Sequence, residues 1–273
     1  MKYAICNELF GDMPWSESFR LAKKYGYTGI EVAPFTLGKD AMSISPTTRQ
    51  DFVRTAKEEG VEILGLHWLL AKTEGYHLTT SDAHVRETTA RYLIELVRLC
   101  RDLGGDLMVL GSPLQRNFGP DMTHEEALRN AQEVLQAVVP ALQEHRVRIA
   151  VEPLGPQEGN FLNHASQART LIEHIGSPWI QLHLDVKAMS SEGVPIPELI
   201  HQNQDIMIHF HANDPNKLGP GMGEVSFVPI FQALQDIDYQ GWVSVEVFDY
   251  SPGIETILDK SMRCMKESLA ACR

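Results

Sequence analysis

The sequence has few cysteines, and those present are scattered. Cys6, Cys100, Cys264 and Cys272 form no CxxC pair and follow no regular spacing in a chain of 273 residues. A disulfide scaffold is typical of short secreted chains with a denser and more regular cysteine pattern. We therefore expect reduced thiols and a cytoplasmic protein.

Long apolar runs and excess positive charge are also lacking. No stretch approaches the roughly 18 apolar residues of a membrane span, and the apolar stretch at the N-terminus is too short for a secretory signal. The net charge is −12 and the pI about 5.4, which argues against non-specific attraction to nucleic acid or anionic membranes. We predict a protein that acts on small molecules, with no nucleic-acid and no membrane partner.

Strand-like and helix-like segments alternate from one end of the chain to the other. No linker, low-complexity stretch or charge block divides them, so we expect one domain over residues 1–273. Eight alternating units predict an α/β fold with a parallel sheet closed into a (β/α)8 TIM barrel. The predicted strands are 3–7, 29–33, 62–67, 107–111 and four runs that end near 152, 185, 211 and 246. The predicted helices lie within 14–25, 46–59, 81–103, 123–145, 164–175, 197–201, 227–236 and 253–271.

Each of the last four strands ends in an acidic or imidazole side chain. These are Glu152 in RIAVEP, Asp185 in IQLHLD, His211 in IMIHFH and Glu246 in WVSVEV. They stand roughly 30 residues apart, the length of one strand–helix unit. The carboxyl ends of barrel strands form one face of the molecule, so the four side chains should converge there.

Alternation within the four runs supports this register. Side chains on a strand point to opposite faces in turn, so His183 shares a face with Asp185, His209 with His211, and Ser244 with Glu246. The other face of each run is apolar and should pack against helices. We expect His183 and His209, one pleat deeper than the ligand-type residues, to be buried interior groups rather than ligands.

Three carboxylates and one imidazole form a ligand set for one divalent metal ion. Such a set suits Mn2+ best, and Mg2+, Co2+ or Zn2+ would also be accepted. The metal would polarise a carbonyl and stabilise an enediolate, while a glutamate abstracts the adjacent proton. Two glutamates on opposite sides of a bound sugar, Glu152 and Glu246, meet the requirement for epimerisation.

Two further residues are candidates for substrate contact. His67 ends the third predicted strand in GLHWLL and should face the same mouth of the barrel. Arg116, in GSPLQRN after the fourth strand, either binds a substrate carboxylate or hydroxyl or forms an exposed ion pair.

With these motifs the chain resembles the xylose isomerase-like barrel superfamily, and more narrowly its sugar phosphate isomerase/epimerase branch. That branch includes ketose 3-epimerases, hydroxypyruvate isomerase and inosose-handling enzymes. VEP, HLD, HFHAND and VSVEVF, in this order, carry a resemblance that covers essentially the whole chain. It implies a metal held by Glu152, Asp185, His211 and Glu246, with the two glutamates as acid–base pair, and a substrate contact by Glu158. Since barrels of this branch are often dimers or tetramers, it also implies a homo-oligomer.

Two departures from the ketose epimerases concern substrate recognition. Those enzymes have a histidine three residues after the Asp ligand, where this chain has Ala188. They have an arginine six residues after the His ligand, where Lys217 keeps the charge but lacks the planar fork. We expect Lys217 to contact the substrate, and the substrate to be a ketosugar, keto-glycoside, keto-inositol or small hydroxy-keto acid.

The leading hypothesis is a metal-dependent carbohydrate isomerase or epimerase. The alternative is a metal-dependent lyase or dehydratase that expels a leaving group from a keto-sugar or keto-inositol instead of reprotonating it. An abasic-site endonuclease shares the fold but has a three-metal cluster and a basic groove. The acidic composition of this chain argues against that function. A non-catalytic sugar-binding barrel would not require both glutamates.

Overall fold

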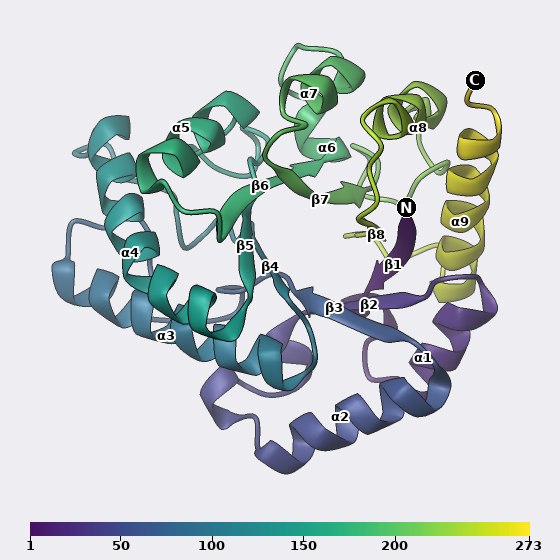
Figure 1. Cartoon of the computed structure of the whole chain (residues 1–273), viewed down its shortest axis with the longest axis horizontal. Coiled ribbons are helices and arrows are strands. Elements are labelled where there is room, and N and C mark those ends of the chain that lie inside the picture. The colour runs from purple at the N-terminus through teal and green to yellow at the C-terminus, as the bar shows by residue number, and fades with distance from the viewer.

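A closed parallel barrel lies at the centre of the protein. The computed structural model describes all 273 residues, and its eight strands follow one another around the barrel in sequence order until β8 pairs with β1. Figure 1 shows the strands in the middle and the helices around them. The strands are β1 (Lys2–Cys6), β2 (Gly29–Val32), β3 (Glu62–Leu66), β4 (Leu107–Leu110), β5 (Arg148–Val151), β6 (Ile180–Asp185), β7 (Met207–Ala212) and β8 (Trp242–Val245).

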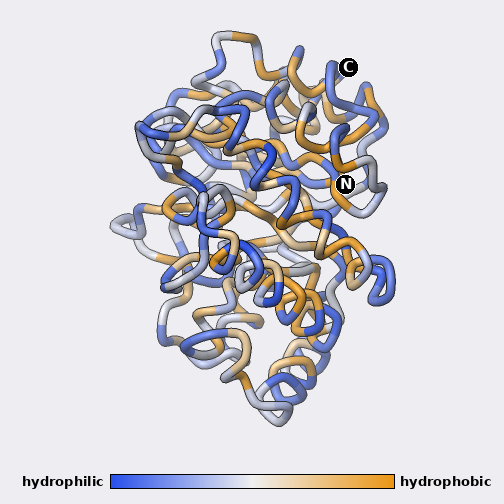
Figure 2. The backbone as a smooth tube through the Cα atoms, turned by 90° about the vertical axis from the view of Figure 1, so that its left-hand side faces the viewer, coloured by the Kyte–Doolittle hydropathy of each residue, from blue (hydrophilic) through white to orange (hydrophobic).

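The helices cover the outside of the barrel. Their apolar stripes and the outer faces of the strands form one continuous core. In Figure 2, hydrophobic and hydrophilic residues alternate along the coils that face the viewer. The α-helices are α1 (Trp15–Lys24), α2 (Pro46–Glu59), α3 (Ala83–Asp102), α4 (His124–His145), α5 (Ala165–Ile175), α6 (Val186–Met189), α7 (Ile196–Gln202), α8 (Phe227–Asp236) and α9 (Ile254–Ala270). Short 3-10 turns are η1 (Asn7–Phe10), η2 (Pro34–Thr36) and η3 (Ala41–Ser43).

The interior of the barrel is layered from apolar to polar. A small cluster near the amino ends of the strands is apolar, and it consists of Ala4, Leu64, Leu107, Val109 and Ala150. Towards the carboxyl ends the register places His183 opposite His209, and Asp185 opposite His211. The predicted inward faces of β6 and β7 are therefore confirmed. The fully buried histidines and Asp185 of these strands therefore lie towards the end of the barrel where a site can form.

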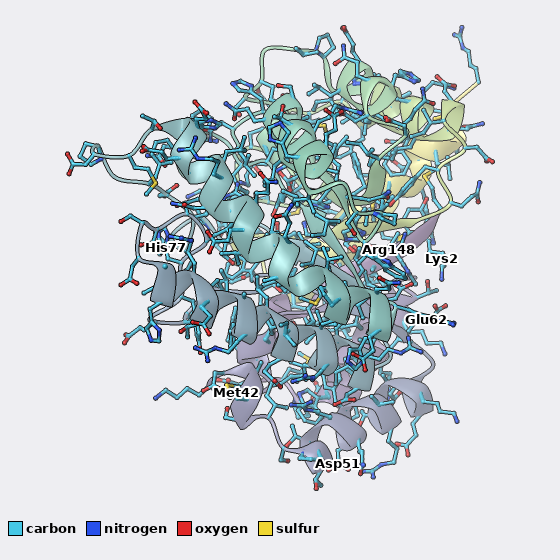
Figure 3. The ribbon with its side chains drawn as sticks, turned by 60° about the vertical axis from the view of Figure 1, so that its left-hand side comes forward. Lys2, Met42, Asp51, Glu62, His77 and Arg148 are labelled. Carbon is cyan, nitrogen blue, oxygen red and sulfur yellow. The ribbon has the colours of Figure 1, made fainter.

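The amino-terminal end of the barrel carries exposed ion pairs. Lys2 at the start of β1 bonds Glu62 at the start of β3 over 3.0 Å, and Arg148 at the start of β5 lies close by in Figure 3. His77, from the long loop between β3 and α3, lies far from these three. Exposed ion pairs contribute little to the free energy of unfolding. The amino-terminal end of a barrel has a structural role, and the active site lies at the other end. No helix combines the length and the apolar character needed to cross a membrane.

The predicted fold class is confirmed, and most boundaries agree within one or two residues. A capping box begins α4: Thr123 Oγ1 accepts from Glu126 N at 3.2 Å, and Glu126 Oε2 accepts from Thr123 N at 2.8 Å. The four-residue helix α6, which begins directly after Asp185, was not predicted. Its first turn is held by that side chain, which accepts from Ala188 N at 2.7 Å.

Candidate active site

The four predicted ligand-type residues gather at the carboxyl end of the barrel. Donor atoms of Glu152, Asp185 and His211 lie within 4.8 Å of one another, together with a ring nitrogen of His183. Glu246 joins this group through His211, whose Nδ1 lies 3.3 Å from Glu246 Oε2. All are buried, at 6% exposure or less. The structure thus brings the expected set together and adds His183 to it.

Glu246 is held so that its two oxygens face different groups. Oε1 accepts a hydrogen bond from Trp68 Nε1 at 2.6 Å and lies 3.4 Å from His67 Nδ1, whereas Oε2 faces His211. Trp68 reaches this position from a left-handed backbone conformation, with φ at 52°. That conformation is strained for a non-glycine residue and is typical of functional sites.

His211 is fixed from behind by a buried carboxylate. Glu31, on β2, lies 3.1 Å from His211 Nε2 and 2.8 Å from His209 Nε2. Burial opposes ionisation of this carboxyl, but the two imidazoles outweigh it and lower the pKa of Glu31 well below its usual range. The carboxylate leaves Nδ1 of His211 free for the open side of the cluster, an arrangement common among metal-binding histidines.

Glu152 occupies space that only a glycine neighbour leaves free. A methyl group on Gly111, which follows β4, would overlap Glu152 Oε2. The buried Arg116 lies behind Glu152 and donates from Nη1 to the backbone carbonyl of Glu152 at 2.7 Å. Burial lowers the pKa of the Arg116 guanidinium to about 10. The end of β5 is therefore shaped by the loop that follows β4.

The electrostatics of the cluster call for a cation. Burial raises the pKa of Glu152 well above its usual value, and repulsion from Glu246 and Asp185 adds to the effect. Burial likewise raises the pKa of Asp185, while Lys187 opposes the shift. Three carboxylates held so close together in a buried site are stabilised by positive charge among them; His211 and Lys187 supply part of it, and a bound cation would add to it.

The residues fit a divalent metal ion. Three carboxylates and imidazole nitrogens are suitable donors for Mn2+, Mg2+ or Zn2+. Both ring nitrogens of His183 are buried without a hydrogen-bond partner, and burial keeps this imidazole neutral by lowering its pKa well below the usual value. A neutral imidazole with an unused nitrogen next to Glu152 (3.6 Å to Oε1) is suited to an ion at this place.

A cavity of about 320 Å³ opens directly above the cluster. Both glutamates, Glu152 and Glu246, form part of its wall, so a bound molecule would contact them. The rest of the lining comes from the loops after β3, β4, β5 and β8 and from α6. A cavity of this size is in the range of small-molecule sites.

The predicted substrate contacts have different outcomes. Glu158 lines the cavity, as a contact residue should. His67 is fully buried between Glu246 and Glu8, 2.9 Å from Glu8 Oε2, and does not line it. Lys217 is exposed on the loop after β7 and also lies outside the lining.

Arg116 needs a correction as well. We expected either a substrate contact or an exposed ion pair, but the guanidinium is 2% exposed and its hydrogen bonds go to the backbone carbonyls of Glu152 and Leu110. A sequence shows which loop carries an arginine, but it does not show that the side chain turns under the loop. Gln115, next to it, lines the cavity instead.

Lys187 and Asn213 are, with Glu31, site residues that we did not predict from the sequence. Lys187 lies on α6 with a side chain only 6% exposed, and its Nζ contacts Glu158 Oε2 at 2.5 Å. Its position two residues after Asp185 was the only signal in the sequence. Because we predicted a loop there and not a helix, the sequence did not show that the lysine side chain enters the site. Asn213 donates from Nδ2 to Asp185 Oδ2 at 2.5 Å and accepts from Lys187 N at 2.9 Å, so it orients both.

The chain is similar to sugar epimerases over most of its length. The family profile described as xylose isomerase-like TIM barrel matches residues 19–268. A probable ketose 3-epimerase from Synechocystis is 28% identical over 236 residues, which are 85% of this chain and 78% of the relative. A 3-dehydro-D-guloside 4-epimerase from Escherichia coli is 26% identical over 255 residues, 90% of this chain and 92% of the relative.

A solved structure has the same fold from end to end. The D-psicose 3-epimerase of Clostridium cellulolyticum H10, crystallised with D-tagatose, superposes with a TM-score of 0.86 at 18% identity and covers 98% of this chain and 99% of its own. These findings confirm the resemblance inferred from the four strand-end motifs.

Proposed function

This chain belongs to the xylose isomerase-like TIM barrel family, and we propose that it is a divalent-metal-dependent epimerase or isomerase of a keto-sugar. The observation that carries the proposal is the pair of buried glutamates, Glu152 and Glu246, which both line the cavity and both border the buried donor cluster. The curated relatives named above are sugar epimerases, which supports this reaction class.

In the proposed reaction, Glu152, Asp185, His211 and Glu246 hold the metal, and Mn2+ is the ion we expect. When bound, the metal supplies Lewis-acid polarisation of a carbonyl oxygen. Glu31 fixes the ring of His211, and Trp68 keeps Oε1 of Glu246 in one place. These contacts preorganise the donor set before substrate enters.

The glutamates do the proton transfer. Glu246 takes the proton from the carbon next to the carbonyl, and the C–H electron pair forms the C=C bond of an enediolate while the carbonyl oxygen gains the charge. Glu152, which starts the cycle protonated, gives its proton to the same carbon from the opposite side; the C=C electron pair forms the new C–H bond, the carbonyl re-forms and the configuration inverts, and exchange with solvent returns both glutamates to their starting states. Glu246 follows β8 and Glu152 follows β5, three strands away in the barrel order, and both line the cavity, which supports transfer at two faces of the substrate.

Solvent-deuterium exchange tests the proposal. We would incubate Mn2+-loaded protein in D2O with ketohexoses, 3-keto-glycosides, keto-inositols and hydroxypyruvate, and follow the α-proton by NMR and mass. The expected result is metal-dependent exchange into one class of compound, with an epimer as product. Loss of water with a new enone would point to the lyase instead, and no exchange by metal-loaded protein would refute the proposal.

Replacement of His211 should weaken metal binding. In His211→Ala one donor is lost and Glu31 is left buried without one of its partners, so we expect Mn2+ affinity to fall by about 100-fold or more. Calorimetric titration measures this directly. His174→Ala, on the exposed face of α5, is the control and should bind as the parent does. Equal affinity in both variants would contradict the ligand assignment.

A further inference from the structure

Lys187 is the only positively charged side chain in the cavity wall that is also buried. Its side chain is 6% exposed, and it lines the cavity together with Glu152 and Glu246. The other lysine of the wall, Lys72, is exposed, and no arginine or histidine lines the cavity. Proton transfer between the two glutamates does not use Lys187, so its place in the wall needs a separate explanation.

A network of hydrogen bonds ties the backbone of Lys187 to the proposed ligand Asp185. The carboxylate of Asp185 accepts from Ala188 N at 2.7 Å and from Asn213 Nδ2 at 2.5 Å. Asn213 Oδ1 in turn accepts from Lys187 N at 2.9 Å. The start of α6 is therefore held against the donor cluster, and the position of Lys187 relative to that cluster is set before a substrate enters.

The amino group of Lys187 is oriented but keeps unused donors. Glu158 Oε2 accepts from Nζ at 2.5 Å, and the centre of the Phe248 ring lies 4.9 Å from Nζ. A lysine ammonium has three N–H bonds, and Glu158 is the only residue that accepts a hydrogen bond from it. Two N–H groups are therefore left for a molecule in the cavity, and the paired carboxylate favours the charged form of the lysine.

Enediolate formation creates a charge that this ammonium is suited to meet. When Glu246 takes the α-proton, the carbonyl oxygen of the substrate gains negative charge. A buried ammonium interacts far more strongly with such an oxygen than with the neutral ketone, and it need not reorganise to do so. A lysine that only balanced the charge of Asp185 and Glu152 would instead stabilise the free protein and the transition state alike.

We propose that Lys187 is a catalytic residue whose ammonium donates a hydrogen bond to the oxygen that becomes negatively charged in the enediolate. The ammonium keeps its protons throughout, and no bond to nitrogen is made or broken. The inference rests on the proposed function and adds one residue to its machinery. It places the effect of Lys187 on kcat for exchange rather than on metal binding.

The variant Lys187→Met tests this in the Mn2+-loaded protein, with the compound into which the parent exchanges deuterium. Loss of one donor to a developing oxyanion typically costs about 10²- to 10³-fold, so we expect kcat to fall by about 100-fold or more and Mn2+ affinity to change far less. Lys260→Met, an exposed position on α9, is the control and should match the parent. A parental kcat in Lys187→Met would overturn the inference, and so would a loss of Mn2+ affinity as large as the loss of kcat.

Chemical rescue distinguishes a donor from a structural lysine. The variant Lys187→Ala is assayed with propylammonium, which carries N–H donors, and with tetramethylammonium, which has the same charge and none. We expect propylammonium to raise the exchange rate of this variant by about tenfold or more and tetramethylammonium to leave it unchanged. Neither ion should change the parent. Equal rates with the two ions would overturn the assigned hydrogen bond.

A binding experiment tests the same point without turnover. Glycolohydroxamate, once ionised, is a planar anion that mimics an enediolate, and hydroxyacetone is a neutral hydroxy-ketone. Both are titrated into the Mg2+-loaded parent and Lys187→Met and followed by NMR. We expect the variant to bind the hydroxamate about tenfold or more weakly and hydroxyacetone nearly as the parent does. Equal hydroxamate affinities would overturn the inference. Failure of the proposed function has a different result, because the metal-loaded parent itself would then exchange no compound.

Discussion

Glu246→Gln is expected to abolish exchange of the substrate's α-proton while the protein still binds metal. The amide keeps one oxygen, which can accept from Trp68, and places its NH2 group where Oε2 faces His211, so the shape of the site is retained. It has no basicity, and the loss of a positioned general base typically costs about 10²- to 10⁴-fold. We therefore expect exchange to fall by about 10³-fold, with Mn2+ affinity reduced far less.

NMR in D2O gives the exchange rate, and calorimetric titration gives the affinity. Glu267→Gln, an exposed position on α9, serves as the matched control, since it makes the same chemical change outside the site. Parental exchange in Glu246→Gln would show that another group takes the proton, and Glu152 would then be the first residue to examine.

Gly111→Ala is expected to inactivate the protein although the change adds one methyl group. The methyl would overlap Glu152 Oε2, so this carboxylate must turn away from Asp185 and His211. A shift of about 1 Å at a reacting group costs on the order of 100-fold. We expect exchange to fall by at least that factor and Mn2+ affinity to fall with it, because Glu152 is both a proposed ligand and a proposed acid.

The control is Gly119→Ala, since a methyl group there meets nothing within 4 Å. Neither glycine has a positive φ, so backbone strain does not separate the two variants. Circular dichroism should show the same fold for both. Parental activity in Gly111→Ala would mean that Glu152 has room to adopt a second working position, contrary to the packing described above.

Periodicity explains why the fold and the ligand cluster could be predicted. The alternation in IQLHLD and IMIHFH sets which side chains enter the barrel, and parallel strands bring their carboxyl ends to one face whatever the loops do. The positions of Asp185 and His211 follow from strand order alone. The alternation of β2 points Glu31 into the barrel in the same way, but the run GIEV is short and we did not name Glu31 as a candidate from the sequence.

The recognition residues lie on segments where no period applies. Arg116 turns under its loop, Lys217 is exposed outside the cavity lining, and Lys187 enters the cavity because α6 begins immediately after Asp185. The places of Arg116 and Lys187 involve hydrogen bonds to residues distant in sequence, Glu152 and Asn213. Spacing patterns do not encode such bonds, so side chains on loops remain the least predictable part of a barrel.

The pairing of β8 with β1 also decides when, during synthesis, the proposed donor set can form. Glu246 follows the last strand, so nearly the whole chain must leave the ribosome before the donor set exists and the sheet can close. At typical elongation rates this takes on the order of ten seconds or more. A chain released early would have two open sheet edges and an incomplete ion site, and both mark it for chaperones and proteases. Metal occupancy in the cell would then report that β8 has been made and has paired with β1.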